Sequence, residues 1–517
     1  MALADWIATV ARRTPGKAAL RFEGEELSYA ALARCVDEAA AALAAAGVAR
    51  GHCVAWLGLN NPAMLAMLFA CARRGALFMP LNWRLAPPEH RAMLLDCPPL
   101  LLCVDKHFAA ASAAQSIAPP GTRCVALGTL PAGWTAWDEF IEPAHAALPA
   151  PAPAAADAPL LLCWTSGSTG RPKGVLLSQE AIQANADASV DMHALTPDDR
   201  VLTTLPLFHV GGLNILTTPA LREGCTVTLH ARFDPEVTLE AIECERITLT
   251  VLVPAQLEAL LAHPRWAGTD LSSLRMISTG STLVPRRLID AVHARGVPLV
   301  QVWGATETAP IAACLHADEA WAKAGSTGRA AAGCELRIVD PQGHDATPDA
   351  SGEILVRGRS VMCGYWHAPA ATAKALAGGW FHSGDIGHFD AQGFLTIDGR
   401  LTDLIISGGE NISPAEIESV LLDCPDIAEA AVIGRADARW GETVVAVIAP
   451  RAGATLTHDR VLAHVEGRLA RFKHPKHVVV VDALPRTALG KVHKDAVRQL
   501  VAARIANPSA TAEEQSA

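Results

Sequence analysis

The sequence lacks any excess of positive charge. Its 517 residues include 43 lysine and arginine residues against 53 aspartate and glutamate residues, a formal net charge of −10. Proteins that hold nucleic acid or an anionic membrane surface do so mainly through basic patches that contact phosphates. The acidic balance and the lack of a basic block therefore argue against both kinds of partner. A few local basic residues must bind any phosphate group.

Paired cysteines and long apolar segments are also missing. The thirteen cysteines are scattered without a Cys-x-x-Cys pair, which argues against a disulfide framework and a structural zinc site. The longest apolar region, 64–81, is interrupted by Arg73 and Arg74, which is wrong for a membrane span. Arg12 and Arg13 follow the short N-terminal apolar stretch, whereas basic residues precede it in a signal peptide. We therefore expect a cytoplasmic protein without a transmembrane segment.

What the sequence does contain is an alternation of helix and strand patterns. Apolar residues recur on one helical face between 32 and 43, and the chain then predicts a strand at 53–58, a helix at 61–74 and a strand at 76–81. This rhythm is typical of parallel sheets covered by helices, so we expect an α/β fold. Because single cores rarely grow beyond about 250–300 residues, the length predicts at least two domains.

The pattern changes near residue 350 to short strands and glycine turns. The segments 386–389 and 394–398 flank a turn at 391–393 and predict a β-hairpin. Further on, Ser413 is suited to cap a helix, and Glu416 completes a capping box. From these changes we expect an N-terminal domain at 1–400, a smaller α+β domain at 401–504 and a disordered tail at 505–517.

The strongest chemical motif is the glycine-rich loop WTSGSTGRPKGV at 164–175, which follows a predicted strand. Glycines let the backbone approach a phosphate, while hydroxyl groups and a lysine supply hydrogen bonds and charge. The spacing does not fit a Walker A loop. An ordinary surface loop is the competing interpretation, and the full string makes it a poor one. The expected ligand contacts are Thr165, Ser166, Gly167, Ser168, Thr169, Gly170 and Lys173.

This loop resembles the signature loop of the adenylate-forming superfamily, which includes acyl-CoA synthetases, peptide-synthetase adenylation domains and firefly luciferase. Similar motifs follow in the family's order over 164–494, and the closest texture is that of bacterial fatty-acid and feruloyl-type CoA ligases. The resemblance implies a large N-terminal domain and a small, mobile C-terminal domain. It also implies that a carboxylate attacks the α-phosphate of ATP, forming an acyl-adenylate from which coenzyme A displaces AMP.

The segment VWGATE at 302–307 resembles the family's aromatic-Gly-x-Thr-Glu motif. The resemblance implies that Trp303 stacks on adenine, Thr306 contacts phosphate and Glu307 coordinates Mg²⁺. Mg²⁺ prefers hard oxygen ligands, usually one or two carboxylates together with phosphates. Without the motif, Glu307 would be interpreted as an ordinary solvated carboxylate. Its place in the motif favours the role in Mg²⁺ coordination. The remaining nucleotide-binding residues expected here are Gln301, Val302 and Gly304.

Asp385 and Arg400 lie on opposite sides of the predicted hairpin, nearly equidistant from its turn. Both should therefore fall at its open end and face one ligand. The resemblance makes that ligand the ribose of ATP, while a surface salt bridge is the competing interpretation. The segment 400–403 resembles the family's hinge between domains, although Thr402 stands where many relatives carry Asp or Lys.

Two motifs of the C-terminal region also resemble family elements. The glycine loop at 404–411 is similar to the one that approaches coenzyme A, with Gly408 and Gly409 as contacts, although a tight turn explains it equally well. The string LPRTALGKVHK at 484–494 matches the terminal motif, in which Lys491 is the catalytic lysine. Its cation would offset charge in the transition state. The competing interpretation is simple exposure, the usual state of a lysine.

His209 occupies the family's substrate-gate position, although a lone histidine is more often structural. Gly280 and Ser281 resemble the loop between the acyl and nucleotide sites. The expected acyl pocket is mostly apolar and contains no Lys or Arg, which disfavours a dicarboxylate such as malonate. Its expected lining is His209, Val210, Gly211, Val253, Thr279, Val302, Ala309 and Pro310. The expected catalytic residues are Lys491, Glu307, Thr165 and His209.

Several acyl acceptors compete. An amino-acid-activating domain should carry an acid near residue 209, and 208–211 offers none. A ligase that loads a separate carrier protein is an alternative, and a luciferase-like oxygenase is a weaker one. A non-catalytic nucleotide-binding regulator would not need Glu307 and Lys491. We therefore expect a ligase that uses ATP, Mg²⁺ and coenzyme A on an aliphatic or aromatic acid, with a homodimer left open.

Overall fold

The computed structural model describes residues 2–142, 156–165, 172–407, 410–437, 440–487 and 490–506. The predictions for Ser166, Gly167, Ser168, Thr169, Gly170, Gly408, Gly409 and the tail from 507 onward lie outside these residues. The chain divides into two units: the first comprises Met1–Ser281, Ala291–Arg337 and Leu355–Ser383, and the second Thr282–Asp290, Ile338–Ile354 and Gly384–Ala517. The domain boundary expected at 400 stays a prediction.

The first unit contains a nine-stranded sheet in the order β16-β15-β14-β13-β12-β10-β11-β1-β2. Its central strands, from β14 to β1, run parallel, whereas β2, β15 and β16 pair antiparallel at its edges. The strands are β1 (Ala18–Phe22), β2 (Glu25–Ser28), β10 (Arg200–Thr203), β11 (Thr226–Leu229), β12 (Leu249–Val251), β13 (Met276–Gly280), β14 (Leu299–Trp303), β15 (Ala313–Cys314) and β16 (Arg329–Ala330).

A second, eight-stranded sheet of this unit has the order β19-β9-β8-β4-β3-β5-β6-β7. The strand predicted at 53–58 is β3, whose five residues are all buried, as are those of β4. The helix predicted between them is α3 (Pro62–Arg74), which begins where the Asn61 side chain accepts a hydrogen bond from Ala63 N. The strands are β3 (Cys53–Leu57), β4 (Leu77–Leu81), β5 (Leu101–Asp105), β6 (Arg123–Leu127), β7 (Thr135–Ala136), β8 (Pro159–Thr165), β9 (Lys173–Ser178) and β19 (Gly364–Tyr365).

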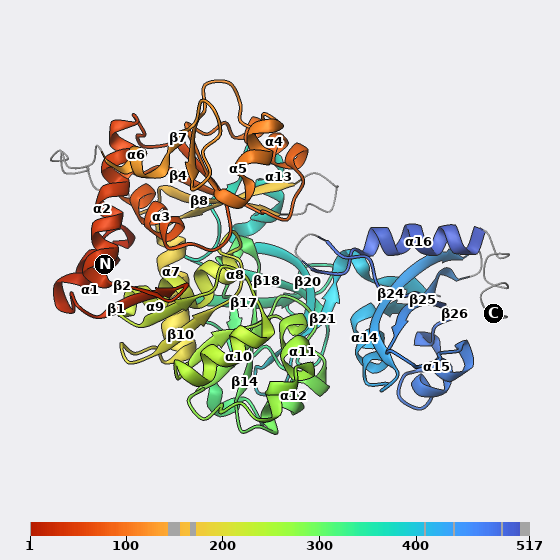
Figure 1. The fold of residues 1–517 in the computed structure, drawn as a ribbon. Coiled ribbons are helices and arrows are strands. Elements are labelled where there is room, and N and C mark those ends of the chain that lie inside the picture. Colours follow the sequence, from red (N-terminus) through yellow and green to blue (C-terminus); the bar gives the residue numbers. More distant parts are fainter. Residues whose placement is uncertain are drawn as a thin grey trace. The chain divides into compact units, whose positions relative to one another are not determined.

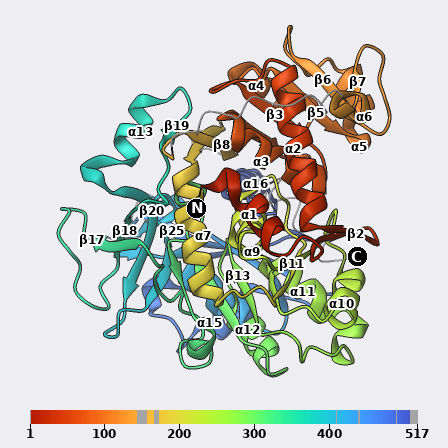
Figure 2. The ribbon, with the colours of Figure 1, turned by 90° about the vertical axis from the view of Figure 1, so that its left-hand side faces the viewer.

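Helices pack around these sheets, as the alternating pattern predicts, and the fold is α/β. The face predicted between residues 32 and 43 belongs to α2, whose apolar residues there are buried. In Figure 2 the yellow helix is α7, which lies against α9. Besides α3, the helices up to residue 375 are α1 (Trp6–Arg13), α2 (Tyr29–Ala45), α4 (Pro87–Asp96), α5 (Lys106–Ala114), α6 (Trp137–Ile141), α7 (Gln179–His193), α8 (Val210–Gly212), α9 (Thr218–Glu223), α10 (Pro235–Cys244), α11 (Pro254–Ala262), α12 (Arg286–His293) and α13 (Pro369–Ala375).

The hairpin predicted after residue 380 is present. It consists of β20 (Phe381–Phe389) and β21 (Leu395–Arg400), which belong to a sheet of the order β17-β18-β20-β21 with β17 (Cys334–Val339) and β18 (Gly352–Gly358). In its turn the Asp390 carboxylate accepts hydrogen bonds from Gln392 N and Phe394 N, both at 2.9 Å. A short acidic side chain at the start of a turn commonly makes such bonds.

The C-terminal sheet is covered by helices on both faces. It contains β22 (Ile405–Ser407), β23 (Glu410–Ile412), β24 (Ile427–Asp437), β25 (Gly441–Pro450) and β26 (His477–Val480). Successive side chains of a strand point to opposite faces, so a strand buried on both faces reads as a continuous apolar run. In β25, Val444, Ala446 and Ile448 enter one core with α14 (Pro414–Leu422) and α15 (His458–Val465), whereas Val445, Val447 and Ala449 enter another with α16 (Lys494–Ala506). Figure 1 shows these helices on opposite faces of the strands.

The predicted helix start at Ser413 is confirmed. The Ser413 hydroxyl accepts from Glu416 N at 3.4 Å, and Pro414 is the first helical residue. The Glu416 carboxylate does not complete the capping box, because it is bound instead by Lys473 Nζ at 2.6 and 2.7 Å. Among the described residues, no helix has both the length and the apolar character needed to cross a bilayer.

Candidate functional site

Three chemically distinct side chains meet where the first unit's strands β9 and β19 pair. Glu307 lies on the 3-10 turn η5 (Thr306–Thr308), just beyond β14. Its Oε1 accepts a hydrogen bond of 2.8 Å from the Tyr365 hydroxyl, and Lys173 Nζ lies 5.2 Å from the centroid of the same ring. The backbone holds this arrangement, because Tyr365 pairs with Val175 and Met362 N donates to Glu307 O at 2.8 Å. A carboxylate, a phenol and an ammonium group are therefore neighbours.

The electrostatics of Tyr365 make it a permanent donor. Burial, and then the charge of Glu307, raise the pKa of Tyr365 well above its ordinary value. The phenol therefore stays protonated at any physiological pH and donates to the carboxylate. The ammonium group of Lys173 faces the ring from a distance at which a cation–π attraction is significant.

The two ends of the glycine-rich loop are fixed by the pairing of β8 with β9. Thr165 is the register partner of Lys173, and the Thr165 hydroxyl donates to Lys173 O at 3.3 Å. Both residues were predicted as ligand contacts, and the structure places them side by side at the base of the loop. Lys173 thereby connects the loop to the Tyr365 and Glu307 pair.

Close backbone contacts explain two glycines near the ends of β13 and β14. A Cβ atom on Gly280 would lie 2.3 Å from Val302 O, and one on Gly304 would lie 1.8 Å from Pro310 O. No side chain fits at either position. The strand β14 also carries Gln301, whose Nε2 donates to Ser326 O at 3.1 Å, and Trp303, which is 8% exposed. The expected stacking of Trp303 on adenine stays a prediction.

The other residues expected near the nucleotide lie close by. Ser281 follows β13 with a positive φ of 76°, which is unusual for a residue with a side chain. Thr306 begins the turn that carries Glu307 and is 8% exposed. Val302 pairs with Gly280 across β13 and β14. These strands therefore bring the segments at 280 and 302–307 together, although the sequence separates them.

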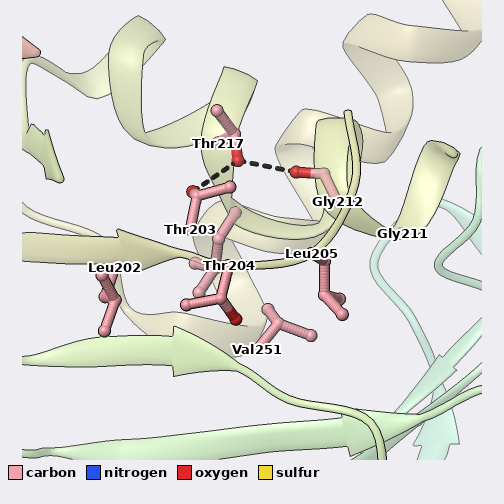
Figure 3. Close-up of a pocket in the computed structure, with 9 residues that line it drawn as sticks. Leu202, Thr203, Thr204, Leu205, Gly211, Gly212, Thr217 and Val251 are labelled. Atoms are coloured by element: carbon pink, nitrogen blue, oxygen red, sulfur yellow. Dashed lines mark hydrogen bonds between the residues drawn. The ribbon is translucent and has the colours of Figure 1, made fainter. Parts of the chain in front are cut away.

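His209 lies at the start of a distorted helix. Its Nδ1 accepts from Gly211 N at 3.0 Å, so the ring caps the short helix α8, and the π-helix η3 (Leu213–Thr217) follows directly. Figure 3 shows a hollow beside this segment, where the Thr217 hydroxyl contacts both Thr203 and the carbonyl of Gly212. The hollow is lined by Leu202, Thr203, Thr204, Leu205, Gly211, Gly212, Leu216, Thr217 and Val251. It shares only Gly211 with the predicted acyl lining, and that prediction stays untested.

Asp385 and Arg400 are register partners in the β20–β21 hairpin of the second unit. Arg400 Nε lies 2.8 Å from Asp385 Oδ1. The side chain of Asp385 is 11% exposed and that of Arg400 is 60% exposed. The two residues thus lie opposite each other at the open end of the hairpin, while the contact with ribose stays a prediction.

Ion pairs fix the segment around Lys491. Thr487 N donates to Lys491 O at 2.7 Å, which closes a turn. On one side of it, Arg486 donates to the Glu429 carboxylate at 2.9 Å and to Gly490 O at 2.8 Å. On the other side, Lys494 Nζ donates to Val432 O at 2.8 Å and pairs with Glu418. Both ends of the turn are therefore anchored to the C-terminal sheet and its helix α14.

Two models of known protein families match most of this chain. The model described as AMP-binding enzyme covers residues 7–366, which include the Glu307, Tyr365 and Lys173 group. The chain belongs to the AMP-binding enzyme family. A second model, AMP-binding enzyme C-terminal domain, covers residues 416–491 and ends on Lys491.

Relatives of this AMP-binding enzyme match it over nearly its whole length. Indoleacetate--CoA ligase of Aromatoleum aromaticum is 59% identical, over 97% of this chain and 98% of the relative. Feruloyl-CoA synthase of an Amycolatopsis species is 42% identical, over 96% and 98%. The solved structure of o-succinylbenzoate CoA synthetase (MenE) from Bacillus subtilis, in complex with the acyl-adenylate intermediate OSB-AMP, is 32% identical with a TM-score of 0.84, over 95% and 97%.

The predicted chemistry is confirmed by these matches. The AMP-binding enzyme is an ATP-dependent acyl-CoA ligase, which activates a hydrophobic carboxylic acid as an acyl-adenylate and transfers it to coenzyme A. Its co-substrates are ATP and coenzyme A, and its metal is Mg²⁺. These matches favour the ligase over the two alternatives of a non-catalytic nucleotide-binding regulator and an oxygenase.

The residues at Glu307 fit the metal that such a ligase uses. Within the described ranges, no three His, Cys, Asp or Glu side chains gather closely enough to hold an ion by themselves. Mg²⁺ instead commonly takes one or two carboxylates together with substrate phosphates and water. The Tyr365 hydroxyl donates to Oε1 of Glu307, and the second carboxylate oxygen is the atom that would hold the ion. Bound there, Mg²⁺ would neutralise phosphate charge.

Sequence reasoning missed Tyr365. It is one of only two tyrosines in the chain, but it lies 58 residues from Glu307 in a two-residue strand that no pattern reveals.

We expect Tyr365→Phe to lower the rate of adenylation about tenfold at low Mg²⁺, because a hydrogen bond to a charged group contributes about 1.5–3 kcal/mol. Saturating Mg²⁺ should restore part of the loss. Pyrophosphate release at increasing Mg²⁺ concentrations would measure it, and an unchanged Mg²⁺ profile would contradict it.

Proposed function

We propose that this acyl-CoA ligase acts on a compact aromatic acid of the arylacetic or hydroxycinnamic type. The observation that carries the proposal is the identity of 59% and 42%, over nearly complete chains, to ligases named for indoleacetate and ferulate. Both names denote a flat ring joined to a carboxylate by a short linker. A site for such an acid must be apolar, with a few polar groups that orient the ring.

Side chains around His209 support this substrate class. The ring of Phe208 meets Trp83 edge-on, with centroids 6.4 Å apart, and Trp83 also packs near Phe108. Leucine and valine side chains and threonine hydroxyl groups also lie beside η3 (Figure 3). Aromatic surfaces and hydroxyl groups of this kind suit a ring that carries one polar atom.

The residue roles expected from the sequence complete the proposal. The loop at 166–170 and Lys173 would hold the phosphates, Glu307 would hold Mg²⁺, and Asp385 would bind ribose. Lys491 would act on adenylation, and 408–409 would approach coenzyme A after the C-terminal domain has turned about a hinge near residue 400. The cytoplasmic location and the homodimer belong to the same proposal.

A substrate panel tests the proposal. The purified enzyme would be given ATP, Mg²⁺ and coenzyme A with indoleacetate, phenylacetate, ferulate, benzoate, hexanoate, palmitate or malonate, and thioesters would be quantified by mass spectrometry. We expect kcat/KM for one of the first three to exceed those for hexanoate and palmitate by about 100-fold, equivalent to about 2.7 kcal/mol. A preference for palmitate or malonate would overturn the aromatic assignment. AMP release without a thioester would move the acceptor to a carrier protein.

A further inference from the structure

A stripe of buried polar residues follows one face of α7. Asn185, Ser189 and His193 are spaced by four residues, so they lie above one another on the helix, and all three are 0% exposed. Polar groups in a protein interior cost free energy unless they are hydrogen-bonded. Each of the three is bonded, and the partners belong to segments that are distant in sequence and adjacent to the predicted substrate site.

The Asn185 amide bridges two of these segments. Its Nδ2 donates to Asn214 O at 2.7 Å, and its Oδ1 accepts from Ile311 N at 2.9 Å. Asn214 lies in η3, the π-helix that follows His209. Ile311 is four residues beyond Glu307. One side chain is therefore hydrogen-bonded both to the segment after His209 and to the segment after Glu307.

Ser189 and His193 continue the network to a third segment. The Ser189 hydroxyl donates to Ile215 O in η3, and His193 Nε2 lies 2.9 Å from Ser278 Oγ in β13. Burial lowers the pKa of His193 to about 4, so the ring is neutral. Because its Nδ1 faces the carbonyl of Ser189 at 2.9 Å, Nδ1 carries the proton and Nε2 accepts from the Ser278 hydroxyl.

The π-helix itself depends on side-chain partners. A π-turn is rare, carries one residue more than an α-turn and is often found at functional sites. Side chains donate hydrogen bonds to three carbonyls in this π-helix or just before it. Thr217 donates to Gly212 O, Asn185 to Asn214 O and Ser189 to Ile215 O. Figure 3 shows the first of these. Of these three donors, only Asn185 also bonds the segment that follows Glu307.

We propose that Asn185 is a positioning residue for adenylation, which holds the segment after His209 and the segment after Glu307 at a fixed separation. The inference rests on the proposed roles of His209 and Glu307. Attack of the carboxylate on the α-phosphate requires the acid and ATP to be aligned, and a misplacement of about 1 Å can cost 100-fold in rate. Once the acyl-adenylate exists, acid and phosphate are covalently joined, so the alignment no longer matters.

Two half-reactions therefore distinguish positioning from mere stability. Asn185→Ala removes both bonds, while Asn185→Asp keeps an acceptor for Ile311 N and replaces the donor to Asn214 O. The matched control is Gln179→Ala, which is also buried on α7 and whose Nε2 donates to Ala72 O in α3 at 2.9 Å rather than to either segment. Adenylation would be followed by ATP–pyrophosphate exchange, and thioester formation by mixing synthetic acyl-adenylate with coenzyme A, both per folded enzyme.

We expect both Asn185 variants to lose about 100-fold in the rate of exchange. Thioester formation from the supplied adenylate should keep most of its rate, and Gln179→Ala should keep most of both rates despite a lower Tm. Equal losses in the two half-reactions, or an exchange rate of Gln179→Ala as low as that of Asn185→Ala, would overturn the proposal. The test uses whichever acid the wild type adenylates, so a wrong aromatic assignment would show in the wild type and leave this comparison intact.

Discussion

Replacement of Lys491 with alanine should block formation of the acyl-adenylate and spare its conversion to the thioester. A cation placed where charge develops in the transition state is worth about 100- to 1000-fold in rate, so the exchange of pyrophosphate into ATP should fall by about that factor. The anchored turn supports this role, because Arg486 and Lys494 fix its two ends. Thioester formation from synthetic acyl-adenylate should proceed at nearly the wild-type rate.

The control for this result is Lys374→Ala, which removes an equal charge from an exposed position on α13. It should leave both half-reactions unchanged. If Lys491→Ala lowered the rates of the two half-reactions equally, the lysine would serve general folding or binding. The prediction that it acts only on adenylation would then be wrong. Circular dichroism of each variant would show whether the C-terminal sheet is intact.

Replacement of Glu307 with glutamine should have the second large effect. Glutamine keeps the size and an oxygen acceptor for the Tyr365 hydroxyl, but it removes the negative charge that Mg²⁺ requires. We expect adenylation to fall by about 100- to 1000-fold, with the half-saturating Mg²⁺ concentration clearly raised. Pyrophosphate exchange measured over a wide range of Mg²⁺ concentrations would test both changes.

A matched control separates metal binding from loss of charge alone. Glu335 is an exposed carboxylate that pairs with Arg357 on β18, so Glu335→Gln removes the same charge elsewhere in the first unit. It should not change the Mg²⁺ profile. An unaltered profile in Glu307→Gln would show that Glu307 only accepts the hydrogen bond from Tyr365, and the metal assignment would then fail.

Features with a local cause were predictable from the sequence. The helix start at Ser413, the strand β3 and the hairpin turn before β21 depend on residues within a few positions of one another, and the structure contains all three. The expected capping role of Glu416 failed for a non-local reason. Lys473, 57 residues away, provides a charged partner for its carboxylate, and a charged pair competes well with a backbone N–H.

The sequence by itself determined the α/β class, the family and its chemistry, because motifs such as WTSGSTGRPKG and WGATE are contiguous and their spacing is visible without a fold. Only the tertiary structure decided which side chains meet. It placed Tyr365 on Glu307, bridged Asn214 and Ile311 through Asn185, and formed the π-helix after His209. The physical reason is that a hydrogen bond acts over about 3 Å in space, whatever the distance along the chain.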